Sequence, residues 1–535
     1  MTGAYSFWHK MLTAGLHRSA KRNPHKVAIA FEEQSWTYSE FDQLTDNFAQ
    51  NLIAAGTEPG DRVALHLRNR PEFAFAFVGC LKAGCIAVPV NPRLKGPEID
   101  FILRHSGSAC YVGQPDLYEE LGSSCPAIAN LEVRYLTDAP AGERTVAFDD
   151  LLRSGDRRVA TLEVEADRIA AILYTSGTTA HPKGVTHSHG SLAQMANSMR
   201  DMKLDDRQVV LIMTSMAHMV GLGMMFLSGL LNGATTVIAR PMEFTKHLEA
   251  YARWRCTYTL GLPVMFEGLI QAQTAVTHDV SSGQFYFCGG DSVSPALQEA
   301  FQAALGPVCE AYGATEIAPI AWNRSGHARP GFIGLPGEGI EIRLVDLDGH
   351  DTGPGEVGEI RVRGPHLMKG YWRDPDATAE AIRDGWFHTG DLARLGHDGY
   401  YYFAGRKKEI IIRGGSNISP HEVEAVLYEH SAVSEAGVIG CPDSVWGEAV
   451  VAYVALRPGR SIAESELISF ARERLADYKT PERILFLSQL PKGPSGKIQR
   501  RALKEFQKEK SHNGNRSVSG PALQDHSNSN QSTDR

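Results

Sequence analysis

The chain has 535 residues, of which 43% are hydrophobic and 22% charged, and its formal net charge is −8. This length is too great for one hydrophobic core, so the sequence predicts at least two domains of ordinary globular composition. The acidic balance excludes a general nucleic-acid binder, because such proteins carry a basic surface. Eight scattered cysteines without a Cys-x-x-Cys pair are typical of free thiols in a reducing cytosol, so we expect a cytoplasmic protein.

Two stretches bear on membrane association. Residues 1–24 lack an uninterrupted apolar segment, which argues against a secretory signal and favours an amphipathic helix. Residues 208–239 contain no charged side chain and are long enough to cross a membrane. Polar residues such as Thr214, His218 and Asn232 interrupt this stretch, so it is predicted as a buried helix between two core strands. No transmembrane segment is expected.

From residue 25 onward, strand-like and helix-like segments alternate. Thr37 and Glu40 form the sequence pattern of a helix capping box. The predicted elements around it are a strand over 27–31, a helix to 55, a strand over 63–67, a helix over 71–83 and a strand over 86–90. The same alternation continues over 169–320. It predicts an α/β fold with two related subdomains and largely parallel sheets.

The pattern changes after residue 331, where short strands are joined by glycine turns. They predict a small barrel-like sheet beside the two subdomains. A compact α+β pattern follows to about residue 507, and residues 508–535 are rich in Ser, Asn and Gln, which predicts a disordered tail. The sequence therefore predicts domains over 1–404 and 405–507 and a tail over 508–535.

The stretch Tyr174-Thr-Ser-Gly-Thr-Thr-Ala-His-Pro-Lys-Gly-Val185 follows a predicted strand. Glycine lets the backbone bend, and the hydroxyls and the lysine can bind phosphate oxygens. The candidate residues are Thr175, Ser176, Gly177, Thr178, Thr179 and Lys183. The order Lys-Gly excludes a Walker A loop, which needs Gly-Lys-Ser/Thr. The stretch resembles, nearly letter for letter, the signature of the adenylate-forming superfamily, which includes acyl-CoA synthetases, luciferases and peptide-synthetase adenylation domains.

The resemblance covers most of the chain from 174 to 500 and implies a site for ATP. Phe287-Cys-Gly-Gly-Asp-Ser-Val293 resembles the segment that runs along the adenine, which assigns Gly289, Gly290 and Asp291 to the nucleotide. The rival interpretation is the phosphopantetheine serine of a carrier domain. Carrier domains are small separate helical units, whereas this stretch lies within a large domain, so the nucleotide interpretation is favoured.

Glu310-Ala-Tyr-Gly-Ala-Thr-Glu316 matches the superfamily motif Tyr-Gly-x-Thr-Glu. The match implies that Tyr312 stacks on the adenine beside Gly313, that Thr315 donates to the α-phosphate, and that Glu316 holds Mg²⁺. Thr178 is the second candidate for the metal.

Three further stretches complete the implied site. Trp386-Phe-His-Thr-Gly-Asp391 resembles the ribose-binding motif, so Asp391 is expected to bind the sugar hydroxyls. Gly405-Arg-Lys-Lys408 resembles the interdomain hinge, with Arg406 reaching the ribose and Lys408 at the pivot of a mobile C-terminal domain. Pro494-Ser-Gly-Lys-Ile-Gln499 resembles the loop of the catalytic lysine, here Lys497. Gly414 and Gly415 are expected beside the pantetheine arm of coenzyme A.

The acyl pocket is expected at Ser215-Met-Ala-His-Met-Val-Gly-Leu222, which assigns His218, Met219 and Gly221 to it. An ordinary core histidine is the alternative for His218. No acidic residue occurs over 208–239, which argues against an amino-acid substrate. Methionines supply pliable apolar surface, and this suits a fatty or aromatic acyl group.

Together the motifs predict an AMP-forming acid:CoA ligase that uses ATP, Mg²⁺ and coenzyme A. Its acid is expected to be a medium- or long-chain fatty acid or an aromatic acid. Catalysis would rest on Lys497, Thr315, Glu316 and Lys408, because transfer to the α-phosphorus needs charge stabilisation rather than a nucleophilic side chain. The alternatives are a ligase that loads a carrier protein, a ligase for a non-carboxylate substrate, and a non-catalytic binding protein. The sequence leaves a homodimer open.

Overall fold

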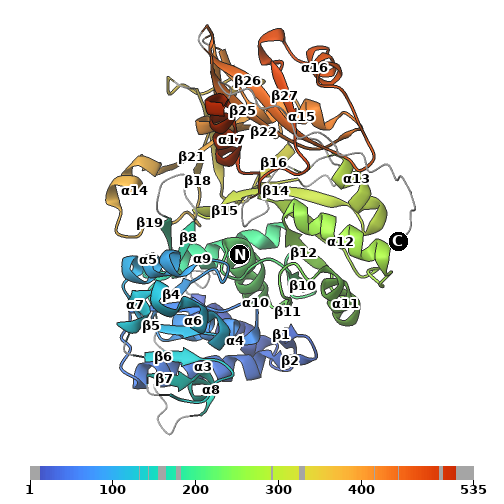
Figure 1. Ribbon diagram of the computed structural model, residues 1–535. Helices are drawn as coiled ribbons and strands as arrows, with labels where there is room; N and C mark the ends of the chain where they lie inside the picture. Colours follow the sequence, from blue (N-terminus) through green and yellow to red (C-terminus); the bar gives the residue numbers. More distant parts are fainter. Residues whose placement is uncertain are drawn as a thin grey trace, which may run out of the picture. The chain divides into compact units, whose positions relative to one another are not determined.

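The computed structural model describes residues 12–131, 133–142, 144–154, 164–175, 182–290, 293, 295–323, 332–346, 348–414, 416–443, 445–492 and 498–513. The chain divides into two compact units, Met1–Lys408 and Glu409–Arg535; in Figure 1 the second is drawn in deeper orange to red. The predicted fold class, a large α/β domain and a small second domain, is confirmed.

The larger sheet of the N-terminal unit has fourteen strands. They are β1 (Val27–Phe31), β2 (Gln34–Thr37), β10 (Val209–Ile212), β11 (Thr235–Ile238), β12 (Tyr258–Gly261), β13 (Phe285–Gly289), β14 (Val308–Ala314), β15 (Ile317–Trp322), β16 (Phe332–Pro336), β17 (Glu341–Val345), β18 (Val357–Arg363), β20 (Ile382–Arg383), β21 (Trp386–Leu395) and β22 (Tyr401–Arg406). Their order is β17–β18–β21–β22–β16–β15–β14–β13–β12–β10–β11–β1–β2, and β20 pairs with β21. The run from β1 to β14 is parallel, whereas β15 pairs antiparallel with β14 and β16.

The second sheet of this unit has eight strands in the order β19–β9–β8–β4–β3–β5–β6–β7. They are β3 (Arg62–His66), β4 (Ile86–Pro89), β5 (Ser108–Gly113), β6 (Val133–Leu136), β7 (Thr145–Ala147), β8 (Ile169–Thr175), β9 (Lys183–Ser188) and β19 (Gly370–Tyr371). Strands β3 to β8 are parallel, and β9 and β19 are added antiparallel at one edge.

The helices of this unit form three layers around the two sheets. They are α2 (Leu12–Arg22), α3 (Tyr38–Ala54), α4 (Pro71–Lys82), α5 (Gly96–Ser106), α6 (Pro115–Leu121), α7 (Pro126–Ala129), α8 (Phe148–Leu152), α9 (His189–Asp201), α10 (Ser228–Asn232), α11 (Phe244–Trp254), α12 (Pro263–Ala275), α13 (Pro295–Ala304) and α14 (Pro375–Ala381), with short turns η1 (Gly122–Ser124) and η3 (Lys407–Glu409) and the π-helix η2 (Val220–Leu227). Helices α2, α3, α4, α9 and α10 share one hydrophobic core with both sheets. Helices α11 to α13 cover the outer face of the larger sheet, and α5 to α7 cover that of the smaller one (Figure 1).

Two sequence expectations of local structure are confirmed in this unit. The capping box begins α3, because Glu40 N donates to Thr37 Oγ1 at 3.2 Å and Thr37 N donates to Glu40 Oε2 at 2.8 Å. The uncharged stretch 208–239 forms β10, η2, α10 and β11 and is largely buried. Among the described residues, no helix is both long enough and apolar enough to span a bilayer.

The C-terminal unit contains a five-stranded sheet in the order β24–β23–β26–β25, with β27 paired to β26. Its elements are β23 (Ile411–Arg413), β24 (Ser416–Ile418), α15 (Pro420–Tyr428), β25 (Val433–Asp443), β26 (Gly447–Leu456), α16 (Glu464–Arg472), η4 (Asp477–Lys479), β27 (Arg483–Phe486) and α17 (Arg500–Asn513). The last helix, α17, runs to Asn513 through a run of Lys and Glu, which are good helix formers.

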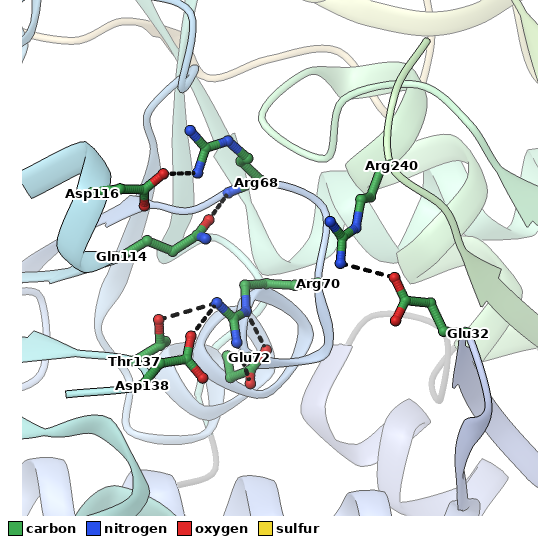
Figure 2. Close-up of polar contacts among 9 residues, drawn as sticks. All are labelled: Glu32, Arg68, Arg70, Glu72, Gln114, Asp116, Thr137, Asp138 and Arg240. Carbon is green, nitrogen blue, oxygen red and sulfur yellow. Dashed lines mark hydrogen bonds and ion pairs between the residues drawn. The ribbon is translucent and has the colours of Figure 1, made fainter. Parts of the chain in front are cut away.

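The loop 67–70 after β3 is held at the carboxyl edge of the smaller sheet, as Figure 2 shows. Arg68 Nη1 lies 2.5 Å from Asp116 Oδ2. Arg70 contacts both oxygens of Glu72 and lies 2.7 Å from Asp138 Oδ2. Each arginine thus has an acidic partner, so this cluster positions the loop and offers no unpaired charge to an anion.

Candidate nucleotide and acyl site

The predicted phosphate loop connects the two strands of a hairpin. Thr175, at the end of β8, lies directly opposite Lys183, at the start of β9. The intervening Ser176, Gly177, Thr178 and Thr179 lie outside the described residues. Thr175 and Lys183 therefore mark the two ends of the loop at the carboxyl edge of a parallel strand, where open α/β sheets bind their ligands.

Thr315 and Glu316 form the two-residue turn between β14 and β15, because Ala314 pairs with Ile317. The backbone oxygen of Thr315 lies 2.8 Å from His187 Nε2 on β9. Burial lowers the pKa of His187 to about 4, so its ring is neutral and its Nε2–H donates to this oxygen. The backbone oxygen of Glu316 accepts from Met368 N at 2.8 Å. Both carbonyl groups of the turn are thus satisfied.

Tyr371, the second residue of β19, connects two of the predicted site residues. Its hydroxyl donates to Glu316 Oε1 at 2.8 Å. Its ring lies under the ammonium group of Lys183, with Nζ 4.7 Å from the ring centroid. The structure therefore brings together Lys183 and Glu316, which come from different sheets.

Magnesium is implied by the resemblance, and the chemistry of Glu316 fits it. The carboxylate lies on a half-buried turn, and one oxygen, Oε1, is fixed by Tyr371. In the part of the chain that the structure describes, Oε2 has no hydrogen bond or ion pair. A carboxylate oxygen left in this way suits a hard cation that takes oxygen ligands. The second candidate, Thr178, lies outside the described residues.

The predicted ribose residues are in direct contact with one another. Tyr312 Oη donates to Asp391 Oδ2 at 2.7 Å, and Arg406 Nε lies 3.1 Å from Asp391 Oδ1. Asp391 and Arg406 are cross-strand partners on β21 and β22, so the sheet register places them together. Burial and the neighbouring Asp391 carboxylate raise the pKa of Tyr312, which keeps the phenol protonated as a donor.

The adenine segment follows β13. Gly289 pairs with Ala311 across β13 and β14. A Cβ on Gly289 would lie 2.3 Å from the Ala311 oxygen, so only glycine fits there. Gly290 has φ of +82°, which also favours glycine. Gly313 lies on β14 next to Tyr312, and Asp291 is outside the described residues.

Glu310 is a buried carboxyl beside this segment that sequence reasoning did not assign. It lies opposite Cys288 on β13, and Gln298 Nε2 of α13 donates to its Oε1 at 2.5 Å. Burial raises the pKa of Glu310 to about 8, although the Gln298 hydrogen bond opposes the shift. The carboxyl is therefore mainly protonated at neutral pH. The signal in the sequence is an acid at the centre of an otherwise apolar strand.

His218 of the predicted acyl pocket is solvent-accessible, which contradicts an ordinary core histidine. The surrounding protein nevertheless lowers the pKa of His218. Desolvation of the ring is the larger cause, and the positive charge of Arg93 is the smaller one. Asn91 Nδ2 lies 3.1 Å from His218 Nε2, and since an amide NH₂ only donates, the ring nitrogen accepts.

Met219 and Gly221 of the same stretch pack in the interior. Met219 is 4% exposed and belongs to the core between the sheets. A Cβ on Gly221 would lie 2.4 Å from the backbone oxygen of Ser215, so glycine permits close packing of η2 on this segment. Neither residue is joined by a described hydrogen bond to His218.

Asn69 was missed by the sequence reasoning and holds the acyl segment in place. Its Nδ2 donates to Thr214 O at 2.8 Å and to Ala239 O at 2.9 Å. Its Oδ1 accepts from Met216 N at 2.8 Å. Asn69 is 3% exposed and uses both donors and its acceptor on backbone groups just beyond β10 and β11 of the larger sheet. An asparagine within Leu67-Arg-Asn-Arg70 carries no local signal for this role.

The remaining predicted residues belong to the hinge and to the C-terminal unit. Lys408 is exposed in η3 at the end of the N-terminal unit. Its neighbour Lys407 lies 3.2 Å from the buried Glu359. In the C-terminal unit, Gly414 N donates to Trp446 O at 2.7 Å. Gly415 and Lys497 lie outside the described residues.

One further acidic group has the spacing of a metal site, formed by His17, Asp42 and Asp46. Lys82, whose side chain is fully buried, already occupies its centre. The Lys82 Nζ lies 2.7 Å from Asp42 Oδ1 and 2.7 Å from Asp46 Oδ1. This group is therefore an ion-pair network built around a buried lysine.

Two family models match the chain. The model of the AMP-binding enzyme matches residues 16–372, and that of the AMP-binding enzyme C-terminal domain matches residues 422–497. Among curated proteins, a feruloyl-CoA synthase from Amycolatopsis sp is 36% identical over 90% of this chain and 96% of that protein. An indoleacetate–CoA ligase from Aromatoleum aromaticum is 33% identical over 91% and 96%. A long-chain-fatty-acid–CoA ligase from Bacillus subtilis is 33% identical over 94% and 96%.

A solved structure gives the same result for the fold. ATP-bound MatB from Rhodopseudomonas palustris superposes with a TM-score of 0.85 and 28% identity, and the match covers 94% of this chain and 99% of MatB. The resemblance that the sequence motifs predicted is confirmed.

Proposed function

The chain belongs to the AMP-binding enzyme family, and from this membership we propose that it converts an aromatic carboxylic acid into its CoA thioester. Its activity class, an ATP-dependent acyl-CoA synthetase that forms AMP and pyrophosphate, is the one predicted from the sequence, and acyl-CoA ligases that match about nine-tenths of the chain support it. ATP and coenzyme A are the co-substrates of this class. The acid is the finer part of the proposal.

The packing of the acyl segment carries the choice of an aromatic acid. Met216, Met219, Met224 and Met225 are each at most 4% exposed and belong to the core between the sheets. Side chains buried to this degree do not line a long open tunnel, so these methionines offer little room for a long alkyl chain. His218, the exposed residue of this packed segment, would contact a compact acyl group. The feruloyl and indoleacetate activities of two relatives agree with this choice.

The first half-reaction follows from the chemistry of a carboxylate. A carboxylate oxygen attacks the α-phosphorus of ATP, the bond to the bridging oxygen of the β-phosphate breaks, and pyrophosphate leaves with the electron pair. Negative charge gathers between the acid and the phosphate, so positively charged groups and donors lower the barrier. We assign this role to Thr315 and Lys497, and the leaving pyrophosphate to Lys183 and the loop that it ends. Glu316 and Thr178 would hold Mg²⁺, which neutralises the phosphate charge.

The nucleoside would be held by the contacts around Asp391. Its carboxylate can accept from the ribose hydroxyls, Tyr312 offers an aromatic face to the adenine beside Gly289, and Arg406 holds Asp391 in place. In the second half-reaction the thiol of coenzyme A attacks the acyl carbon and AMP leaves. We propose domains over 1–404 and 405–507, with a pivot at Lys408. Rotation about this pivot between the two steps would withdraw Lys497 from the site and bring Gly414 and Gly415 to the pantetheine arm of coenzyme A.

Pyrophosphate release measured with a panel of acids tests the proposal. Aromatic acids should support release and CoA-thioester formation at higher kcat/KM than medium- and long-chain fatty acids. Mass spectrometry of the product separates an acyl-CoA from an acylated carrier protein. Lys497→Ala should lose adenylation, whereas Lys246→Ala, on the surface of α11, should keep it. Preference for a long-chain acid would refute the choice of acid, and an unaffected Lys497→Ala enzyme would refute the assigned catalytic lysine.

We also propose a cytoplasmic location, because all eight cysteines are free thiols and seven of them are buried. Such thiols persist in a reducing compartment. A homodimer is a further expectation, which sedimentation of the purified protein tests directly.

A further inference from the structure

Tyr371 contacts two candidate site residues that are far apart in the sequence. Tyr371 is paired with Val185 on β9, and Trp372 N donates to Gly184 O at 2.7 Å. This pairing fixes the tyrosine beside the first residue of β9, Lys183. From there its hydroxyl reaches Glu316 Oε1 at 2.8 Å, and the Lys183 ammonium lies 4.7 Å from its ring centroid.

The hydroxyl gives the carboxylate of Glu316 a definite orientation. The phenol donates this hydrogen bond, because a carboxylate oxygen can only accept one. A hydrogen bond to a charged acceptor is stronger than one between neutral groups. Because Oε1 is engaged, the oxygen that remains for a cation is Oε2, and its direction is set by Tyr371.

The ring holds the ammonium of Lys183 without neutralising its charge. Within the described residues, Lys183 has no carboxylate at ion-pair distance. An aromatic face attracts a cation weakly at a partly exposed site. A carboxylate in the same place would compete with phosphate for the lysine, whereas the ring leaves the full charge for an incoming anion.

We propose that Tyr371 is a positioning residue that sets the distance and direction between Lys183 and Glu316, so that the two act together on a magnesium-bound triphosphate. This inference rests on the proposed function, because it takes Glu316 as a ligand of the metal and Lys183 as a ligand of the phosphates. The two halves of the side chain have separate tasks. The hydroxyl serves the metal side and the ring serves the phosphate side.

Two variants separate these tasks. Tyr371→Phe removes the hydroxyl and keeps the ring, whereas Tyr371→Leu removes both. Tyr38→Phe is the matched control, because its buried hydroxyl also donates to an oxygen, Ala234 O at 2.7 Å, away from the candidate site. The readout is equilibrium binding of ATP, measured by calorimetry without any acid, in the presence of Mg²⁺ and in the presence of a chelator.

We expect the loss of ATP affinity to differ between the measurements with Mg²⁺ and with the chelator. Tyr371→Phe should weaken ATP binding about tenfold with Mg²⁺ and hardly at all with the chelator, the size expected for one hydrogen bond to a charged group. Tyr371→Leu should weaken binding in both conditions, by roughly threefold with the chelator, which corresponds to a lost cation–π contact. Tyr38→Phe should bind as the parent enzyme does in both conditions.

Two outcomes would overturn the inference. In one, Tyr371→Phe binds ATP as the parent enzyme does with Mg²⁺. In the other, it weakens binding equally with Mg²⁺ and with the chelator, as a merely structural residue would. In both cases, adenylation of an acid by the parent enzyme would leave the proposed function standing. A parent enzyme that binds no ATP would overturn both.

Discussion

Glu310→Gln should remove a pH dependence of stability from the N-terminal unit. Glutamine has nearly the shape of a protonated glutamic acid, and its side-chain oxygen can still accept from Gln298 Nε2, as Glu310 Oε1 does at 2.5 Å. The substitution therefore keeps the packing between α13 and β14 and removes only the titration. Any difference between the two proteins that changes with pH belongs to the carboxyl of Glu310.

The size of this effect follows from the change in pKa. Glu310 has an ordinary pKa of 4.5, and burial raises the pKa to about 8 in the folded chain. The folded state therefore binds its proton more tightly than the unfolded state. The contribution is fully present below pH 4.5 and is lost as the pH rises toward 8. Between pH 5 and pH 8 the parent protein should lose about 3–4 kcal/mol relative to Glu310→Gln.

Thermal unfolding measured at several pH values checks this prediction. The difference in Tm between the parent protein and Glu310→Gln should change by on the order of 5 °C between pH 5 and pH 8, with the variant gaining at high pH. Glu120→Gln, an exposed position on α6, is the matched control and should show no such trend. Parallel curves for Glu310→Gln and the parent protein would refute the reasoning, since they would show that Glu310 is ionised at the same pH in the folded and unfolded states.

Three further substitutions test other contacts. Tyr312→Phe keeps the ring but removes the donor to Asp391, so kcat/KM for ATP should fall about tenfold in a pyrophosphate-release assay. An unchanged value would show that the Tyr312 hydroxyl does not help to hold Asp391 for the ribose. Asn69→Leu removes the hydrogen bonds to three backbone groups around the acyl segment. The KM for the acid should rise about tenfold, while the KM for ATP changes far less. Equal changes in both KM values would contradict a role specific to the acid. Arg500→Met leaves the buried Glu424, whose oxygens lie 2.8 and 2.7 Å from Arg500 Nη2, without its cation. The free energy of unfolding of the C-terminal unit should fall by about 3–5 kcal/mol in a calorimetric scan. An unchanged transition would show that the ion pair gives no net stabilisation.

Sequence patterns predicted what is encoded locally. The capping box of Thr37 and Glu40 and the alternation of strands and helices depend on neighbours within a few residues, and both are confirmed. Asp391 and Arg406 could be assigned together only through motifs, and their contact comes from a cross-strand register that the motifs do not encode. Asn69 could not be predicted at all, because its partners lie about 145 residues or more further along the chain.

The turn of Thr315 and Glu316 shows why the candidate site depends on both sheets at once. Thr315 and Glu316 belong to a hairpin of the larger sheet, yet the groups that hold their backbone oxygens, His187 Nε2 and Met368 N, come from the edge of the smaller sheet and from the segment just before β19. Tyr371 adds a third contact from the same edge. A shift of one sheet against the other would therefore break at least one of the turn's hydrogen bonds to His187, Met368 and Tyr371. A nucleotide bound between Lys183 and Glu316 would oppose that shift, so binding of ATP should raise the thermal stability of the whole N-terminal unit rather than of one sheet alone.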